Sequence, residues 1–375
     1  MKRLDLNRIG LALAAPLLAV AFSVLVTSVI LLVAGDPVWL TWKTLIFGSG
    51  QPHAMTRTLL QTVNLGTTYY LSAIAVAIGF RMNLFNIGVD GQYRMAVFAA
   101  AVVGSWLDLP RPLHLLVIIV VAMVVGAAWA SIAGLLKVGR GVSEVISTIM
   151  LNAIAGYLLA YLLRKVASGE PASNNISTKE IPLSGRMPGI TLVPDVPVQT
   201  YGFVFVAILV GFGYWYLLGR TRFGFDLRAT GRSATAAVAS GVNVKRMVLI
   251  SMALSGAIAG LVGLPELLGK TYQYDLSFPA GIGFTGIAIA LVGRNSPIGV
   301  AIAALFFAYL NTSSNPLQII AGVAPEIVVV MQGIITFAVV VAYELVRRYG
   351  VAREQRRVAE QLTAGPGTAA QEVTA

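Results

Sequence analysis

The sequence predicts an all-α, polytopic integral membrane protein with about ten transmembrane helices. Hydrophobic residues make up 57% of the 375 positions and charged residues only 11%, against roughly 25% charged residues in soluble domains. Only helices and closed barrels can span a bilayer, because no water is present there to bond the backbone. The apolar runs are long and uninterrupted, whereas barrel strands alternate apolar and polar residues over about ten positions. We therefore expect helices.

A helix needs about 20 mostly apolar residues to cross a membrane. The first apolar run follows a basic N-terminus in the layout of a signal peptide, but it is longer than the usual h-region and lacks a small-residue cleavage site. We expect it to be retained as the first span. The expected spans are 9–34, 59–80, 86–107, 113–136, 143–163, 201–218, 247–268, 279–293, 296–312 and 325–346.

Basic residues alternate along these spans as the positive-inside rule requires. The connections expected inside are rich in Lys and Arg, whereas those expected outside are close to neutral. Both termini are therefore expected in the cytoplasm. The net charge of +11 could also indicate nucleic-acid binding, but the charges sit at the ends of apolar runs and form no basic-aromatic stretch. We expect membrane lipid and no nucleic acid as a partner.

Three segments outside the spans differ in composition. The outside loop 164–200 is rich in Pro, Ser and Asn, and could be an external cap, a docking surface or a disordered connection. The inside loop 220–246 contains the short Ala-rich run SATAAVASG. We expect a transmembrane domain over 1–349 and a disordered cytoplasmic tail over 350–375.

No enzyme site is evident in the sequence. The absence of cysteine excludes disulfides and thiolate metal sites, and we expect no metal or cofactor. His53 and His114 fall in outside connections and are expected to be surface residues. The run GLPELLGKT resembles a phosphate-binding loop, but its two glycines, Gly263 and Gly269, are one residue too far apart. We expect no ATP hydrolysis by this chain.

Two Gly-interrupted regions, 78–92 and 278–300, predict a solute pathway, because broken spans in the two halves of a transporter point to its substrate site. Ionisable groups near span ends are few: Asp90, Arg94, Glu144, Glu266 and Glu326. Amides in or beside spans are more numerous: Asn64, Asn83, Asn86, Gln92, Asn152, Asn311 and Gln332. Such amides bind ligands or, more commonly, bridge helices. The pathway candidates are Asn83, Asn86, Asp90, Gln92 and Asn152. Gly256 and Gly260 are expected to pack helices.

Several motifs then resemble one family in order along the chain. FRMNLFNIGVDGQ resembles F-x-x-G-L-F-N-I-G-x-E-G-Q, and EVISTIMLN resembles N-E-V-I-x-T-x-M-L-N. GFDLRATGRSATAAVASGVNV and GRNSPIGV match two further motifs. These are signatures of permeases in the branched-chain amino acid and sugar ABC importer superfamily, in particular its nucleoside and simple-sugar branch. Met82, Asn83 and Asp90 depart from the family pattern.

The resemblance implies a permease subunit in a bacterial plasma membrane, working with cytoplasmic ATPase subunits, a second permease, and an external binding lipoprotein or periplasmic protein. It also implies that the inside loop couples to the ATPase, through Arg228, Gly231, Thr235, Ala236, Ala237 and Gly241. The expected substrate is a nucleoside or simple sugar, whose identity the sequence leaves open, as it does homodimer or heterodimer. The alternative is a stand-alone secondary carrier or channel for a small polar solute.

Overall fold

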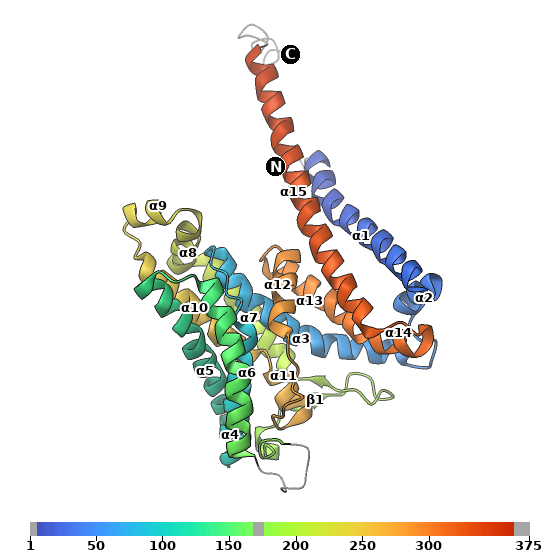
Figure 1. Cartoon of the computed structure of the whole chain (residues 1–375), viewed down its shortest axis with the longest axis vertical. Helices are drawn as coiled ribbons and strands as arrows, with labels where there is room; N and C mark the ends of the chain where they lie inside the picture. The colour runs from blue at the N-terminus through green and yellow to red at the C-terminus, as the bar shows by residue number, and fades with distance from the viewer. Residues whose placement is uncertain (1–5, 168–175, 364–375) are drawn as a thin grey trace. The chain divides into compact units, whose positions relative to one another are not determined.

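The computed structural model describes residues 6–167 and 176–363 (Figure 1). This part of the chain is helical except for connections and one antiparallel pair of short strands, β1 (Gly189–Ile190) and β2 (Thr200–Tyr201). The chain divides into two compact units, one formed by Met1–Thr41 with Val323–Ala375 and the other by Trp42–Gly322.

The first unit pairs the first and last long helices. In it α1 (Leu6–Ala34) packs along α15 (Pro325–Thr363). The expectation of a disordered tail from residue 350 does not hold for its first part, since α15 continues to Thr363. The residues beyond the span are mostly good helix formers such as Ala, Arg, Glu and Gln. The rest of that tail, 364–375, lies outside the described residues.

The remaining helices follow in chain order. Each of the ten expected spans falls on a helical segment in the described part of the chain, and 247–268 covers more than one element. The elements are α2 (Val38–Phe47), α3 (Ala54–Arg81), α4 (Val89–Trp106), α5 (Arg111–Arg140), α6 (Glu144–Val166), η1 (Leu183–Gly185), α7 (Phe203–Arg220), α8 (Arg222–Arg232), α9 (Ala234–Ala239), α10 (Val244–Leu261), α11 (Leu264–Glu266), the π-helical turn η2 (Leu267–Thr271), α12 (Ile282–Val292), α13 (Pro297–Thr312) and α14 (Ser314–Ala321).

Seven of the described helical segments are long and apolar enough to cross a membrane, and shorter apolar helices accompany them. The prediction of an all-α polytopic membrane protein is therefore confirmed. The helix α4 is 18 residues long, but its first two turns carry Asp90, Gln92 and Arg94, which lowers its mean hydropathy. The helix α12 has only 11 residues, as expected for a broken span.

The centre of the second unit is α3, whose last five turns are almost wholly buried. It packs against α7, α10, α12 and α13. Beside it, α5 and α10 pack at the distance that small residues permit: a Cβ on Gly256 would lie 2.3 Å from the Gly126 carbonyl oxygen, and one on Gly260 would lie 2.1 Å from that of Ala122. The predicted packing role of Gly256 and Gly260 is thus confirmed.

The described part of the outside loop, residues 176–200, is folded and not disordered. Its backbone bonds the segment that follows η2: the amide of Thr178 donates to the carbonyl of Tyr274 over 2.9 Å, and that of Ile181 to Tyr272 over 2.8 Å. These contacts lie at the end of the second unit opposite α8 and α9 (Figure 1).

His114 is not a surface residue, and the expectation for it was wrong. Its ring is fully buried in the first turn of α5. One ring nitrogen, Nδ1, lies 2.9 Å from Ser184 Oγ, and Nε2 lies 2.9 Å from the carbonyl oxygen of Gly104. The folded outside loop covers this helix end, which sequence position could not reveal. His53, by contrast, is exposed as expected.

Candidate functional site

The two Gly-interrupted regions meet inside the second unit. The carboxylate of Asp90, in the first turn of α4, accepts hydrogen bonds from the backbone amides of Gly281 (2.8 Å) and Gly283 (3.3 Å) at the start of α12. The hydroxyl of Tyr93 donates to the carbonyl of Pro279 over 2.6 Å. A carboxylate is favoured at this place because it lies in the first turn of α4 and accepts from amides at the N-terminus of α12.

The pathway candidates Asn86 and Gln92 bond each other. Asn86 Nδ2 donates to Gln92 Oε1 over 3.0 Å and to Ser255 Oγ over 2.8 Å, while Gln92 Nε2 donates back to Asn86 Oδ1 over 2.9 Å. Both amides are buried. They tie α4 and its preceding connection to α10, which is the helix-bridging use that was the commoner alternative.

Asn152 makes a similar bridge from α6. Its Nδ2 donates to the carbonyl of Ile87 over 2.9 Å, and its Oδ1 accepts from the amide of Gly91 over 2.8 Å. The remaining candidate, Asn83, is exposed in a left-handed turn with φ 59°. We call Asn86, Gln92 and Asn152 the amide cluster. None of its members lines the polar cavity described below.

The inside loop forms two short helices, α8 and α9. The side chain of Ser233 caps α9 by accepting a hydrogen bond from the amide of Ala236 over 3.2 Å. Within α9, Ala237 is buried, whereas Thr235 and Ala236 are exposed. Gly241 ends this segment in the left-handed region, with φ 82°, a conformation that favours glycine. The loop thus presents a compact, partly exposed element.

Gly231 of the inside loop contacts the first Gly-interrupted region, 78–92. A Cβ on Gly231 would lie 2.7 Å from the carbonyl oxygen of Arg81 and 2.9 Å from the backbone of Met82. No larger residue could pack α8 so closely against the end of α3. Arg228 is half-buried in the same helix.

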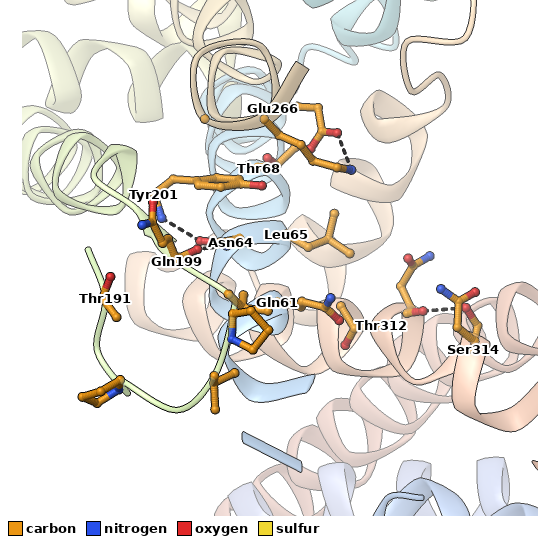
Figure 2. A pocket seen from close by; sticks show the side chains of 18 residues that line it. Gln61, Asn64, Leu65, Thr68, Thr191, Gln199, Tyr201, Glu266, Thr312 and Ser314 are labelled. Atoms are coloured by element: carbon orange, nitrogen blue, oxygen red, sulfur yellow. Dashed lines mark hydrogen bonds and ion pairs between the residues drawn. The ribbon is translucent and has the colours of Figure 1, made fainter. Parts of the chain in front are cut away.

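A polar cavity of about 830 Å³ opens at the opposite end of the second unit (Figure 2). It is bounded by one side of α3, the loop between β1 and β2, the segment of α11 and η2, and the junction of α13 with α14. Its side chains are mainly amides and hydroxyls, among them Gln61, Asn64, Thr68, Gln199, Tyr201 and Asn311.

Asn64 fixes the β1–β2 loop to α3. Its Nδ2 donates to the carbonyl of Gln199 over 2.8 Å, and its Oδ1 accepts from the amide of Tyr201 over 2.9 Å (Figure 2). One side-chain amide therefore satisfies a backbone acceptor and a backbone donor of the same loop. The wall of the cavity formed by this loop depends on that pair of bonds.

The charged groups of the cavity wall are paired. Lys270 Nζ lies 2.8 Å from Glu266 Oε1, so this part of the wall presents little net charge. Burial first, and then the nearby Glu266 carboxylate, raise the pKa of the Tyr201 phenol to about 12. Tyr201 therefore remains a neutral hydrogen-bond donor over the physiological range. Its ring packs on Gly269, where a Cβ would lie 2.7 Å from a ring carbon.

Known proteins resemble this chain over most of its length. Residues 58–340 match the family described as the permease component of the branched-chain amino acid transport system. The guanosine ABC transporter permease protein NupP of Bacillus subtilis is 34% identical over 333 residues, which cover 88% of this chain and 93% of that protein. The chain belongs to this permease family.

Two further relatives of the permease come from other organisms. The nucleoside ABC transporter permease protein NupB of Lactococcus lactis is 32% identical, with 88% of this chain and 90% of that protein covered. The glucose ABC transporter permease protein TsgB13 of Haloferax volcanii is 31% identical, with 80% of each covered. The permease is thus a transport component and not an enzyme. The matched residues include the cavity, the amide cluster and both helices of the inside loop.

Sequence reasoning missed most of the permease's cavity. It noted Asn64, Asn311 and Glu266 only as polar residues near spans, and did not single out Gln61 or Tyr201. One signal was present: Gln61, Asn64 and Thr68 recur at helical spacing and form a polar stripe on one face of a span. No group of three or more His, Asp or Glu side chains that could hold a metal ion occurs within residues 6–167 and 176–363.

Proposed function

We propose that this permease is the membrane-spanning subunit of an ABC importer for a nucleoside or a simple sugar. The names of its relatives support this, since guanosine, nucleoside and glucose transporters are among them. The observation that carries the proposal is the polar cavity. Its volume of about 830 Å³ falls in the usual range for small-molecule sites.

The chemistry of the cavity favours a neutral solute with many hydrogen-bonding groups. Amides and hydroxyls can both donate to and accept from sugar hydroxyls and base edges. A phosphorylated solute would need unpaired cations, whereas Lys270 is held by Glu266. A nucleoside meets these conditions, and the neutral Tyr201 phenol adds a donor to the wall.

The partners follow from the same proposal. Two cytoplasmic ATP-binding subunits would dock on α8 and α9, where Phe225 is 64% exposed and Val238 is 61% exposed. A second permease would complete the pathway, and an external binding protein would deliver the solute to the end that carries the β1–β2 loop. Both termini would lie in the cytoplasm, and the membrane would be a bacterial plasma membrane.

The earlier pathway candidates keep a part in this proposal. Asp90 and the amide cluster would hold the interrupted helices in place beside the pathway, and Asn83 would lie near its cytoplasmic end. The inside-loop residues Arg228, Gly231, Thr235, Ala236, Ala237 and Gly241 would form the element that the ATPase moves. In this arrangement the buried side chain of Ala237 holds α9 in place.

Uptake by the reconstituted transporter tests the proposal. The permease, its second permease, ATPase and binding protein would be placed in vesicles and supplied with labelled guanosine, adenosine, ribose or glucose. We expect uptake of one of these solutes only with ATP and the binding protein. Uptake by the permease alone, without an ATPase, would favour the stand-alone carrier and overturn the proposal.

The coupling role has its own test. The change Ala237→Glu places a charge at a buried position of α9. Gly241→Glu puts a side chain in a left-handed turn. We expect either variant to insert in the membrane at normal levels and to lose uptake. Normal uptake in both would contradict the role of the inside loop.

A further inference from the structure

The turn between α12 and α13 is strained. Arg294 and Asn295 are consecutive residues in the left-handed region, with φ 55° and 53°. Side chains other than glycine rarely adopt this conformation, and it persists only where surrounding structure enforces it. Strained residues cluster at active sites, ligand clamps and switch regions.

Three donor atoms hold this turn through one carbonyl oxygen, that of Asn295. Arg81, the last residue of α3, donates to it from Nη2 over 2.8 Å and from Nε over 3.2 Å. The hydroxyl of Tyr214 in α7 donates over 2.7 Å. The side-chain oxygen Oδ1 of Asn295 is buried without a hydrogen-bond partner. Within the turn, Ser296 Oγ also donates to the Gly293 carbonyl over 3.1 Å. The Asn295 carbonyl itself is held by side chains of α3 and α7.

Of the two residues that hold the turn, Arg81 contacts α8 directly, and Tyr214 lies in the helix on whose end α8 packs. The backbone of Arg81 lies against Gly231 of α8, where even a Cβ would approach within 2.7 Å. Tyr214 lies two turns before the end of α7, and Gly224 of α8 packs on that end, where a Cβ would lie 2.4 Å from the Leu217 carbonyl oxygen. A displacement of α8 must therefore move the groups that hold Asn295.

This turn connects α12 and α13, and each of these helices reaches one of the regions described above. At its far end α12 is bonded to Asp90 through Gly281 and Gly283, and α13 ends in residues that line the polar cavity. Tight packing transmits such shifts because packed elements have discrete arrangements.

We propose that Arg81, Tyr214 and the strained turn 293–296 form a relay, which passes movement of α8 to α12 and α13. Arg81 is a positioning residue in this relay: it acts through the Asn295 carbonyl and touches no solute. The inference rests on the proposed function, because it requires that an ATPase move α8. The relay sets how much transport each hydrolysed ATP produces.

The ratio of ATP hydrolysed to solute taken up tests the relay in the complete reconstituted transporter. We expect Tyr214→Phe, which removes one hydrogen bond, to raise this ratio about three- to tenfold. Arg81→Gln removes two bonds and should raise the ratio by at least as much. The apparent KM for solute should stay unchanged. The double variant should show less than the product of the two effects, since both bonds end on one oxygen.

Matched controls come from α7 and from the end of α5. Tyr216→Phe alters an exposed tyrosine of α7, and Arg140→Gln an exposed arginine at the end of α5; both should leave the ratio unchanged. If Arg81→Gln fails to assemble, Tyr214→Phe decides the result, because it removes only a hydroxyl. A parallel fall of hydrolysis and uptake at constant ratio would overturn the relay.

A second measurement follows the movement itself. The chain has no cysteine, so spin labels can be attached at two introduced cysteines, Ile298→Cys in α13 and Leu209→Cys in α7, both at exposed positions. We expect nucleotide binding to change the distance between the labels, and Arg81→Gln to abolish the change. If the distance between the labels still changes in that variant, the relay is overturned. ATP-independent uptake by the unmodified transporter would instead refute the proposed function.

Discussion

The amide cluster and the polar cavity contain the same kinds of side chain in opposite conditions. In the cluster, Asn86 and Gln92 are buried and bond each other. In the cavity, the side-chain amides of Gln61 and Asn311 make no hydrogen bond within the described part of the chain. An amide already bonded to its neighbours contributes to stability, whereas an unbonded amide is available to a solute.

Asn64 stands between these two conditions. It lines the cavity, yet both ends of its amide are bonded to the backbone of the β1–β2 loop. Its effect on a solute would therefore be indirect, through the position of the loop. The comparison predicts three different outcomes for three kinds of amide substitution.

The largest effect is expected in the cluster. Asn86→Leu would leave Gln92, Ser255 and the amide of Gly88 without their buried partner. We expect a loss of about 1–3 kcal/mol in the free energy of unfolding, measured by thermal unfolding of the solubilised permease. The matched control is Asn83→Gly, which removes an exposed amide from the same connection and suits its positive φ. An equal loss in both variants would contradict the distinction.

Asn64→Leu should come next, with effects on both the loop and transport. Loss of two bonds to the loop should increase protease cleavage within 191–199 and raise the KM for uptake by about tenfold, as expected for one to two lost hydrogen bonds. Gln61→Ala, one turn earlier on α3, is the control for the loop, because its side chain makes no bond to it. If Asn64→Leu leaves cleavage unchanged, the loop is held by other contacts.

Substitution of the unbonded amides should alter uptake only. We expect Gln61→Ala and Asn311→Ala to raise the KM about three- to tenfold each, and to shift the unfolding midpoint by less than the error. Gln318→Ala removes an exposed amide of α14 outside the cavity lining, and should change neither quantity. A drop in stability without a change in KM would assign these amides to packing. The contrast between the amide cluster and the cavity would then be wrong.

The smallest effect concerns pH. The pKa of Tyr201 is raised to about 12 from its usual 10, so between these values the folded state binds more protons than the unfolded state. Its contribution is constant below pH 10, and stability should fall as the pH rises from 10 to 12. Tyr201→Phe should lessen that fall in the unfolding midpoint. If the unfolding midpoint depends on pH identically in the unmodified permease and in Tyr201→Phe, the phenol ionises equally in the folded and unfolded states.

Some features followed from the sequence because they depend on local composition. Long apolar runs predicted ten spans, each of which falls on a helical segment in the described part of the chain, since a bilayer allows few other structures. The close packing of Gly256 and Gly260 was also predicted, because small residues at this spacing mark helix contacts. The short helix α12 was predicted from its flanking glycines.

The partners of polar side chains were beyond the reach of sequence. His114 was expected at the surface but is buried beneath the outside loop, because that loop bonds a segment about 90 residues later in the chain. Asn86 and Asn152 were candidates for the pathway, yet their bonds reach α10 and the α3–α4 connection. Such long-range contacts leave no periodic trace in the sequence.

The sequence by itself determined that this is a helical membrane permease, because hydropathy, charge alternation and local motifs are properties of neighbouring residues. Only the tertiary structure decided which amides are bonded and which face the cavity. It also decided that Arg81 and Tyr214 converge on one turn, and that Gly231 packs against Arg81. The physical reason is that a hydrogen bond depends on distance in space, which the folded helices set between residues far apart in the chain.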